Sequence, residues 1–146
     1  MPSDLITADQ FQSLLKKHRP KATPEHDLQC EVVFDFDKDY PTYEGLLFAI
    51  PNGAKLPYKT VKGKRVCPEA IKLKKEGMRP GVPDLCLPVP KGRYHGLFVE
   101  MKYGDNKPST EQVFWMQRLT KLGYCCKVCY TRQEARHIFK TYLSLE

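Results

Sequence analysis

The stretch GLFVEMK, residues 96–102, has the pattern of a buried β-strand that ends at a polar site. Residues 97–99 are Leu, Phe and Val, and β-branched and aromatic side chains favour strands. Side chains two positions apart in a strand project to the same side, so Glu100 and Lys102 share one face and Met101 lies on the other. An acid and a base are therefore expected to meet where the strand ends.

The size and composition of the chain favour one globular domain. Its 146 residues match the usual length of a single domain, and 41% of them are apolar, which is well above the range of disordered chains. The sequence contains no run of about 18 apolar residues and no charged start followed by an apolar segment. It therefore predicts no membrane span and no secretory signal, and we expect a cytoplasmic protein.

Six cysteines raise the question of a zinc site, because Cys126 and Cys129 have a spacing typical of zinc ligands. A structural zinc site needs a second pair of ligands at similar spacing, and the sequence offers none. Residues 124–130 also read as a strand, in which positions three apart point to opposite faces. We therefore expect reduced, mostly buried thiols, with a zinc-dependent module as an alternative that metal analysis would test.

Positive charge is concentrated in residues 55–79. This segment has nine basic and two acidic residues, so its net charge of +7 equals that of the whole chain. Clustered lysines in a turn-rich loop fit contact with a polyanion backbone, where each neutralised phosphate releases counterions. A solvated helix face and loop would explain the same pattern, so the charge alone leaves both interpretations open.

Capping residues and hydrophobic periodicity predict an α/β order of elements. Thr23, Ser109 and Thr131 fit helix N-caps, and Gly77 and Gly123 fit helix ends. The predicted helices cover about residues 7–19, 23–37, 68–76, 109–122 and 131–144. The predicted strands cover 45–50, 84–87, 94–102 and 124–130, the middle two as a hairpin with a turn around Lys91 and Gly92.

Two carboxylates are expected at one end of this hairpin. Asp84 begins one strand and Glu100 ends the other, with fifteen residues between them. Neighbouring carboxylates raise each other's pKa unless a cation relieves them, and hard oxygen ligands suit Mg²⁺ or Mn²⁺. Lys102 beside such an ion could offset charge on a phosphate. The plainer alternative is a wet strand face with an ordinary cross-strand Asp–Lys pair.

Five motifs in order resemble one nuclease family. They are PEHDLQ (24–29), LFAIPNGA (47–54), GMRPGVPDLCLP (77–88), YHGLFVEMK (94–102) and PSTEQVFWMQRLTKLGY (108–124). Together they resemble the VRR-NUC family, the virus-type replication-repair nucleases of the PD-(D/E)xK superfamily. The resemblance implies a restriction-endonuclease-like α/β core, with a central mixed β-sheet flanked by α-helices. It also implies a nuclease domain at 23–146 that follows an N-terminal helix or extension at 1–22.

The resemblance also implies roles for individual residues. Asp84 and Glu100 resemble the family's metal-binding carboxylates, with the Met101 carbonyl as a further ligand. Lys102 resembles the catalytic lysine. Glu25 resembles the helix glutamate that binds or orients the metal and its water. Three acids from distant parts of the chain are thus expected around one divalent ion.

Two further positions have a structural and a functional interpretation each. Gln112 resembles the glutamine that follows the lysine motif, and it also fits a capping box with Ser109, so it could do both. Asn52 resembles the family's PNG loop, where turn chemistry and nucleic-acid contact both remain open. The arginine associated with the stretch after that loop is not obvious in this chain, and Lys55 or Arg65 could substitute for it.

By resemblance, we expect a DNA endonuclease that depends on Mg²⁺ or Mn²⁺ and hydrolyses phosphodiester bonds in branched DNA such as Holliday junctions. Its expected setting is phage or prophage, in a bacterial host, with DNA as partner. We expect a homodimer, because a junction needs two symmetric cuts, and no small-molecule cofactor. The alternative is a non-catalytic nucleic-acid-binding module that uses residues 55–79. The candidate nucleic-acid contacts are Asn52, Lys55, Lys62, Lys64, Arg65, Lys72, Lys74, Lys75 and Arg79.

Overall fold

The structure is a computed structural model that describes residues 23–52 and 59–146. Its helices are α2 (Pro24–Asp39), the short 3₁₀ helix η1 (Pro41–Tyr43), α3 (Pro68–Lys75), α4 (Thr110–Lys121) and α5 (Arg132–Leu143). Its strands are β1 (Phe48–Ala49), β2 (Lys59–Val61), β3 (Lys64–Val66), β4 (Leu85–Leu87), β5 (Leu97–Met101) and β6 (Cys125–Cys129). Among the helices described here, none is long and apolar enough to cross a membrane. The helix predicted at 7–19 lies outside the described residues.

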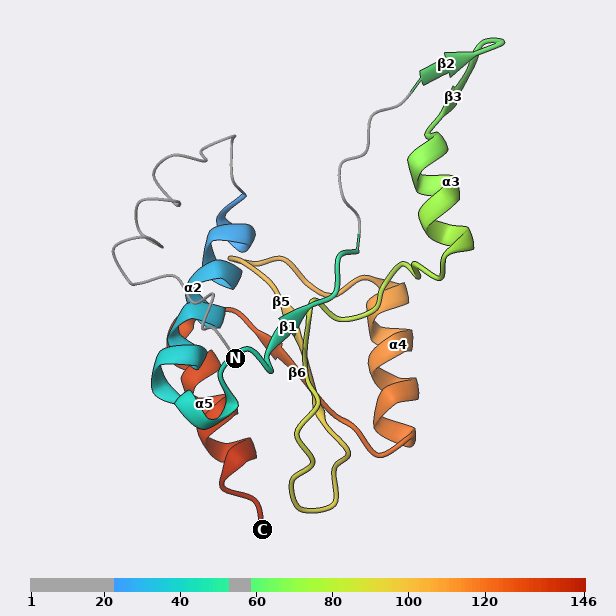
Figure 1. Cartoon of the computed structure of the whole chain (residues 1–146). Helices are drawn as coiled ribbons and strands as arrows, with labels where there is room; N and C mark the ends of the chain where they lie inside the picture. Colours follow the sequence, from blue (N-terminus) through green and yellow to red (C-terminus); the bar gives the residue numbers. More distant parts are fainter. Residues whose placement is uncertain (1–22, 53–58) are drawn as a thin grey trace, which may run out of the picture.

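A four-stranded mixed sheet forms the centre of the molecule, as the sequence predicted. Its strand order is β1-β4-β5-β6, with β5 and β6 parallel and the other pairs antiparallel. A parallel pair needs a crossover connection, and α4 provides it between β5 and β6. Helices α2 and α5 pack on one side of the sheet and α4 on the other (Figure 1). The predicted strand 45–50 shortens to β1, because pairing with β4 covers only two residues before Pro51.

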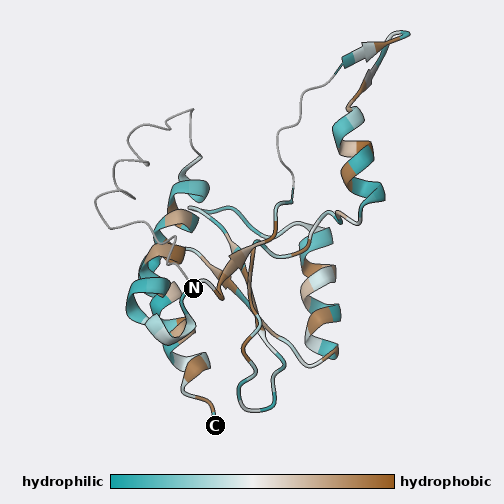
Figure 2. Cartoon of the chain, viewed as in Figure 1, coloured by the Kyte–Doolittle hydropathy of each residue, from teal (hydrophilic) through white to brown (hydrophobic). Residues whose placement is uncertain are grey.

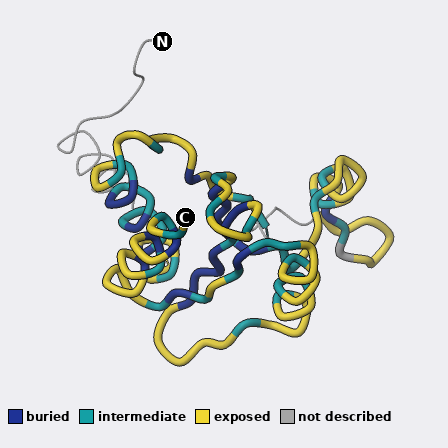
Figure 3. The backbone as a smooth tube through the Cα atoms, turned by 90° about the horizontal axis from the view of Figure 1, so that it is seen from below, coloured by how far each residue is buried: buried dark blue, intermediate teal, exposed yellow. Residues whose placement is uncertain are grey.

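The hydrophobic core lies between the sheet and the α2–α5 pair. Leu97, Val99 and Met101 of β5 are buried there with Phe36 of α2 and Phe139 of α5. The two phenylalanine rings meet edge to face, with centroids 4.8 Å apart. Figure 3 shows the buried backbone along the strands and the inner sides of these helices. The strand alternation in residues 96–102 thus places Leu97, Val99 and Met101 in the core.

A buried carboxylate ties α2 to α5. Asp35 accepts two hydrogen bonds from Arg132, at 2.8 and 2.7 Å, and Arg136 lies 3.4 Å from the same carboxylate. The hydrogen bond from Arg132 lowers the pKa of Asp35, and the nearby positive charges add to this effect against the opposing effect of burial. This pairing fixes where α2 lies on the sheet, and with it the position of the helix start that carries Glu25.

The basic segment forms a projection that we call the basic arm, residues 59–76. It consists of the β2–β3 hairpin followed by α3, and it extends away from the sheet (Figure 1). Hydrophilic residues alternate with apolar ones along it (Figure 2), and α3 has no buried residue. The sequence predicted a loop here, so the hairpin is a correction. Lys62 and Gly63 both have positive φ, of 49° and 74°, as a tight hairpin turn requires.

Candidate active site

Asp84 and Glu100 come together at one end of the β4–β5 pair. Leu85 pairs with Val99 in the antiparallel register, so the next opposed positions are Asp84 and Glu100. Asp84 Oδ2 accepts a hydrogen bond of 2.8 Å from the Met101 amide, across the strand pair. The Asp84 carbonyl accepts another, of 2.7 Å, from the amide of Ile50 after β1. Three strands therefore hold this aspartate at the sheet end, where the hairpin was predicted to bring it.

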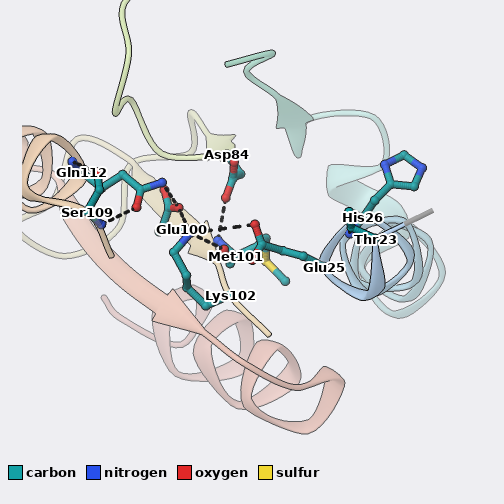
Figure 4. Close-up of polar contacts among 9 residues, drawn as sticks. All are labelled: Thr23, Glu25, His26, Asp84, Glu100, Met101, Lys102, Ser109 and Gln112. Atoms are coloured by element: carbon teal, nitrogen blue, oxygen red, sulfur yellow. Dashed lines mark hydrogen bonds and ion pairs between the residues drawn. The ribbon is translucent and has the colours of Figure 1, made fainter. Parts of the chain in front are cut away.

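Glu100 is fully buried, and only one of its carboxylate oxygens has partners. Its Oε1 accepts hydrogen bonds from Lys102 Nζ at 2.7 Å and from Gln112 Nε2 at 2.5 Å (Figure 4). Its Oε2 has no hydrogen-bond partner in the part of the chain that the structure describes. A buried carboxylate oxygen without a partner is costly. The unpartnered oxygen therefore points to a ligand outside the protein chain.

Glu100 and Lys102 shift each other's pKa: the ammonium lowers that of Glu100, and the carboxylate raises that of Lys102. The pKa of Glu100 is raised to about 7, chiefly by burial; the hydrogen bond from Lys102 lowers it, and the charge of Asp84 adds to the rise. Burial alone would lower the pKa of Lys102, but its hydrogen bond to Glu100 and the surrounding carboxylates raise it overall. The ammonium group therefore stays charged near neutral pH, beside the Glu100 oxygen to which it is hydrogen-bonded.

Lys102 links the sheet to α2. Its ammonium, with 9% of the side chain exposed, donates to Glu100 and to the Met101 carbonyl at 3.1 Å, and it lies 3.8 Å from Glu25 Oε1. Glu25 stands in the first turn of α2, after the Thr23 cap. The predicted helix start thus delivers Glu25 to the site, on the side of the ammonium (Figure 4).

The structure does not bring the three predicted acids into one cluster. Within residues 23–52 and 59–146, no group of three or more His, Cys, Asp and Glu side chains is arranged to hold a metal ion. Asp84 and Glu100 meet, whereas Glu25 pairs with Lys102 instead of joining them. The reason is the docking of α2, which brings Glu25 to the lysine and leaves about a third of its side chain exposed.

Gln112 combines its two predicted roles. Its Oε1 accepts a hydrogen bond of 2.7 Å from the backbone amide of Ser109. The backbone amide of Gln112 in turn donates to Ser109 Oγ at 3.3 Å, which completes the capping box of α4. Its Nε2 donates to Glu100. Reversing the side-chain amide would place its oxygen against a carboxylate, so the cap fixes the donor toward Glu100.

Asn52 has a structural partner close to the site. Its Nδ2 donates to the carbonyl of Val82, two residues before Asp84. The contact joins the loop after β1 to the loop that leads into β4. Asn52 therefore helps to place Asp84, which supports the turn interpretation of the PNG stretch. A contact with nucleic acid stays a prediction.

The basic candidates divide into engaged and free-standing groups. Arg79 Nη1 donates to the carbonyls of Lys74 and Met78, at 3.0 and 3.2 Å, and so caps the end of α3. Lys72 lies 3.8 Å from Glu76. Among the predicted contacts, the exposed lysines of the arm are Lys62, Lys64, Lys72, Lys74 and Lys75. Lys55 lies outside the described residues, as does the side chain of Arg65.

The cysteines follow the strand alternation that the sequence predicted. Cys125 and Cys129 are buried in the core on the α2–α5 side, and Cys126 is half-buried on the opposite face. Cys126 and Cys129 therefore point to opposite sides of the sheet. All six cysteines are free thiols.

The donor set fits a divalent ion. Asp84 and Glu100 supply carboxylate oxygens, and Met101, whose carbonyl is the further predicted ligand, directly follows Glu100 in the chain. Hard oxygen donors of this kind suit Mg²⁺ or Mn²⁺, and Mg²⁺ is often bound through only one or two carboxylates. The unpartnered Oε2 of Glu100 is the structural observation that such an ion would explain.

A family model for the VRR-NUC domain matches residues 45–133, which is more than half of the chain. The protein belongs to the VRR-NUC domain family. A solved structure described as a VRR-NUC domain protein has the same fold, with a TM-score of 0.60 and 25% sequence identity over 86% of this chain and 92% of that one. No curated protein matches the sequence. Membership of the VRR-NUC family implies a nuclease of the PD-(D/E)xK type, with DNA as its substrate.

The VRR-NUC match coincides with the geometry of the site. Pro83-Asp84 and Glu100-Met101-Lys102 spell the superfamily pattern in this chain, and both motifs lie within the matched residues, as does Gln112. Glu25 precedes the matched region. The family assignment therefore agrees with the cluster around Glu100, whereas the contact between Glu25 and Lys102 comes from the structure.

Proposed function

We propose that the protein is a DNA endonuclease that depends on Mg²⁺ or Mn²⁺ and hydrolyses phosphodiester bonds at the Asp84–Glu100–Lys102 site. The observation that supports this most directly is the buried Glu100 carboxylate, with one oxygen bound by Lys102 and Gln112 and the other free for a ligand. When bound, the ion supplies Lewis acidity and lowers the pKa of water.

The chain's own groups have distinct tasks in this proposal. Lys102 and Gln112 hold Oε1 of Glu100, which leaves Oε2 oriented toward the ligand. The Met101 amide holds Asp84 in the same way. The Lys102 ammonium offsets negative charge that develops on the phosphate, where a fixed cation needs no reorganisation. Glu25 keeps that ammonium in place from the side of α2.

We further propose that the substrate is branched or flapped DNA. The basic arm projects from the body of the molecule and carries exposed lysines that can follow a phosphate backbone away from the site. A homodimer would supply two symmetric sites for a junction. A phage or prophage origin in a bacterial cytoplasm would fit this chemistry.

The test uses a panel of labelled DNAs that includes a four-way junction, a flap, a single strand and a plain duplex. The parent protein is expected to cut branched or flapped DNA with Mg²⁺ or Mn²⁺. Asp84→Ala is expected to retain DNA affinity and lose cleavage, while the exposed control Asp27→Ala cuts like the parent. If the parent nicks none of these DNAs with either metal, the protein is a binding module instead. Light scattering of the same samples gives the mass that tests the dimer.

A further inference from the structure

A cavity of about 560 Å³ lies beside the candidate active site. It is lined by Trp115 and Leu119 of α4, by Phe98 of β5, and by Leu73 and Met78 from the end of α3 and the loop after it. None of these five residues has a role in the proposed reaction. The volume is within the range of sites that bind small organic groups.

The cavity and the active site are built on the same two elements. Phe98 and Glu100 are two residues apart on one face of β5, a separation of about 7 Å. Gln112 and Trp115 are three residues apart on α4, so they also lie on one side of their helix. Val82, two residues before Asp84, lines the cavity as well. A group bound in the cavity would therefore lie next to the Asp84–Glu100 pair.

The chemistry of the cavity fits a flat aromatic ring with polar edges. The lining is mainly apolar, and polar atoms come from a few side chains, among them Asn52 and Arg79. Trp115 is half-buried and offers the largest ring surface. The guanidinium of Arg118 lies over that ring, 5.8 Å from its centre, so a cation stands near the aromatic surface.

Charge indicates which molecule would bring such a ring. One wall of the cavity is the end of α3, and α3 belongs to the basic arm, whose exposed lysines favour a polyanion. The cavity is lined both by the end of α3 and by residues close to Asp84 and Glu100, so a strand that follows the arm toward this pair would pass it. The aromatic groups on a polyanionic strand are nucleobases, and base stacking on aromatic side chains is a common source of single-strand affinity.

We propose that the cavity accepts one unpaired nucleobase of the DNA substrate, stacked on Trp115, while the adjacent phosphate lies at Asp84 and Glu100. The inference rests on the nuclease function proposed above and adds the source of its selectivity. A base in a continuous duplex must leave its stack to enter, at a cost of a few kcal/mol, whereas an unpaired base at a flap or branch enters without that cost.

The first experiment uses Trp115 as a reporter, because it is the only tryptophan of the chain. The protein is titrated with oligothymidylate, and separately with an abasic strand of equal length, in EDTA so that no cleavage occurs. We expect saturable quenching with oligothymidylate, no quenching with the abasic strand, and at least about 5-fold weaker binding of the abasic strand by anisotropy.

Three results would overturn the inference in this experiment. They are equal quenching by both strands, no quenching by either, and quenching that depends on protein concentration without DNA. The last result would mean that a second copy of the chain covers the cavity.

The second experiment compares two substitutions on α4. Trp115→Leu keeps an apolar side chain but removes the stacking surface, and Phe114→Leu is the control, since Phe114 is 54% exposed and does not line the cavity. We expect Trp115→Leu to raise the Kd for oligothymidylate and the KM for flapped DNA by at least about 5-fold. Its Kd for plain duplex should not change, and Trp115→Phe should recover most of the loss. Circular dichroism melting shows that each variant is folded.

These readouts separate the two proposals. If the parent cleaves flapped DNA and Trp115→Leu affects flap and duplex equally, the base-binding inference is wrong while the nuclease stands. A different outcome is that the parent cleaves none of the DNAs, while Trp115 is quenched by oligothymidylate and not by the abasic strand. In that case the nuclease proposal fails and base binding by the cavity stands.

Discussion

The two faces of β5 differ in their surroundings: one packs in the hydrophobic core, and the other carries a residue of the candidate active site. Leu97, Val99 and Met101 point to the α2–α5 side, where they are completely enclosed by apolar side chains. Phe98 and Glu100 point to the α4 side, where a buried acid and an open cavity lie next to each other. One five-residue strand thus supplies packing on one side and chemistry on the other. Substitutions on the two faces should therefore have separable effects on stability and on cleavage.

The largest effect is expected at Lys102, on the functional face. Lys102→Met removes the cation from the site, and we expect the single-turnover cleavage rate to fall on the order of 10²- to 10³-fold. The fold should survive, because methionine fills much of the same space and Glu100 can take up a proton once its ammonium partner is gone. Lys127→Met, at an exposed lysine on β6, is the matched control and should cleave normally. A variant at position 102 with the parent's rate would refute a catalytic role for the lysine.

The next largest effect is expected on the face of β5 that packs against α2 and α5. It concerns stability and not cleavage. Leu97→Ala removes a fully buried side chain and should lower the free energy of unfolding by about 2–5 kcal/mol. Urea unfolding measures this loss. At a temperature where the variant is fully folded, its cleavage rate should equal that of the parent. A selective loss of cleavage with unchanged stability would show that the two faces are not separable.

Local signals explain most of what the sequence could predict. Helices α2, α4 and α5 begin within one residue of their predicted caps, because Thr23, Ser109 and Thr131 each bond to a backbone amide three residues on. The meeting of Asp84 and Glu100 followed from strand alternation and one hairpin. The β2–β3 hairpin was missed because its strands are short and rich in lysine, although the Lys-Gly turn at its tip is a usable signal.

Features that depend on docking between distant elements could not be predicted. Glu25 reaches Lys102 because the Asp35–Arg132 contact, between residues 97 positions apart, sets where α2 lies on the sheet. The cavity beside Trp115 needs α3, α4 and the loop after β1 at once. Neither arrangement has a sequence period or a spacing that indicates it.

A smaller effect should separate the two roles of Gln112. Gln112→Ala loses both its cap and its contact with Glu100, so we expect about 10- to 100-fold slower cleavage and a loss of about 1 kcal/mol in stability. Ser109→Ala loses only the cap and should show the stability change alone. Comparing both variants by urea unfolding and by single-turnover cleavage isolates the orientation of Glu100. Equal cleavage by the two variants would leave Gln112 with a structural role only.

The Asp35 pairing gives a prediction about pH on the packing side. The pKa of Asp35 is lowered in the folded protein, so its contribution to stability is present above its unfolded pKa of about 3.9 and is lost as the pH falls through the folded value. Asp35→Asn should therefore cost about 1 kcal/mol at pH 7, since its arginine partners are about half exposed. Urea unfolding of the parent and of Asp35→Asn should show that their difference in free energy of unfolding becomes smaller in acid. A difference that grows in acid would mean that Asp35 is not ionised in the folded state.

The smallest effect is expected in the basic arm, which belongs to neither face of β5. Lys62→Ala combined with Lys64→Ala removes two exposed charges from the hairpin. The double variant should keep the parent's free energy of unfolding and the parent's rate of the chemical step. If both lysines contact phosphates, the slope of log K against log salt concentration for duplex DNA should become less steep by about 1.8. Lys140→Ala, on the exposed side of α5, is the control and should keep the parent's slope. An unchanged slope in the double variant would place the DNA elsewhere, because an arm that binds no phosphate releases no counterions.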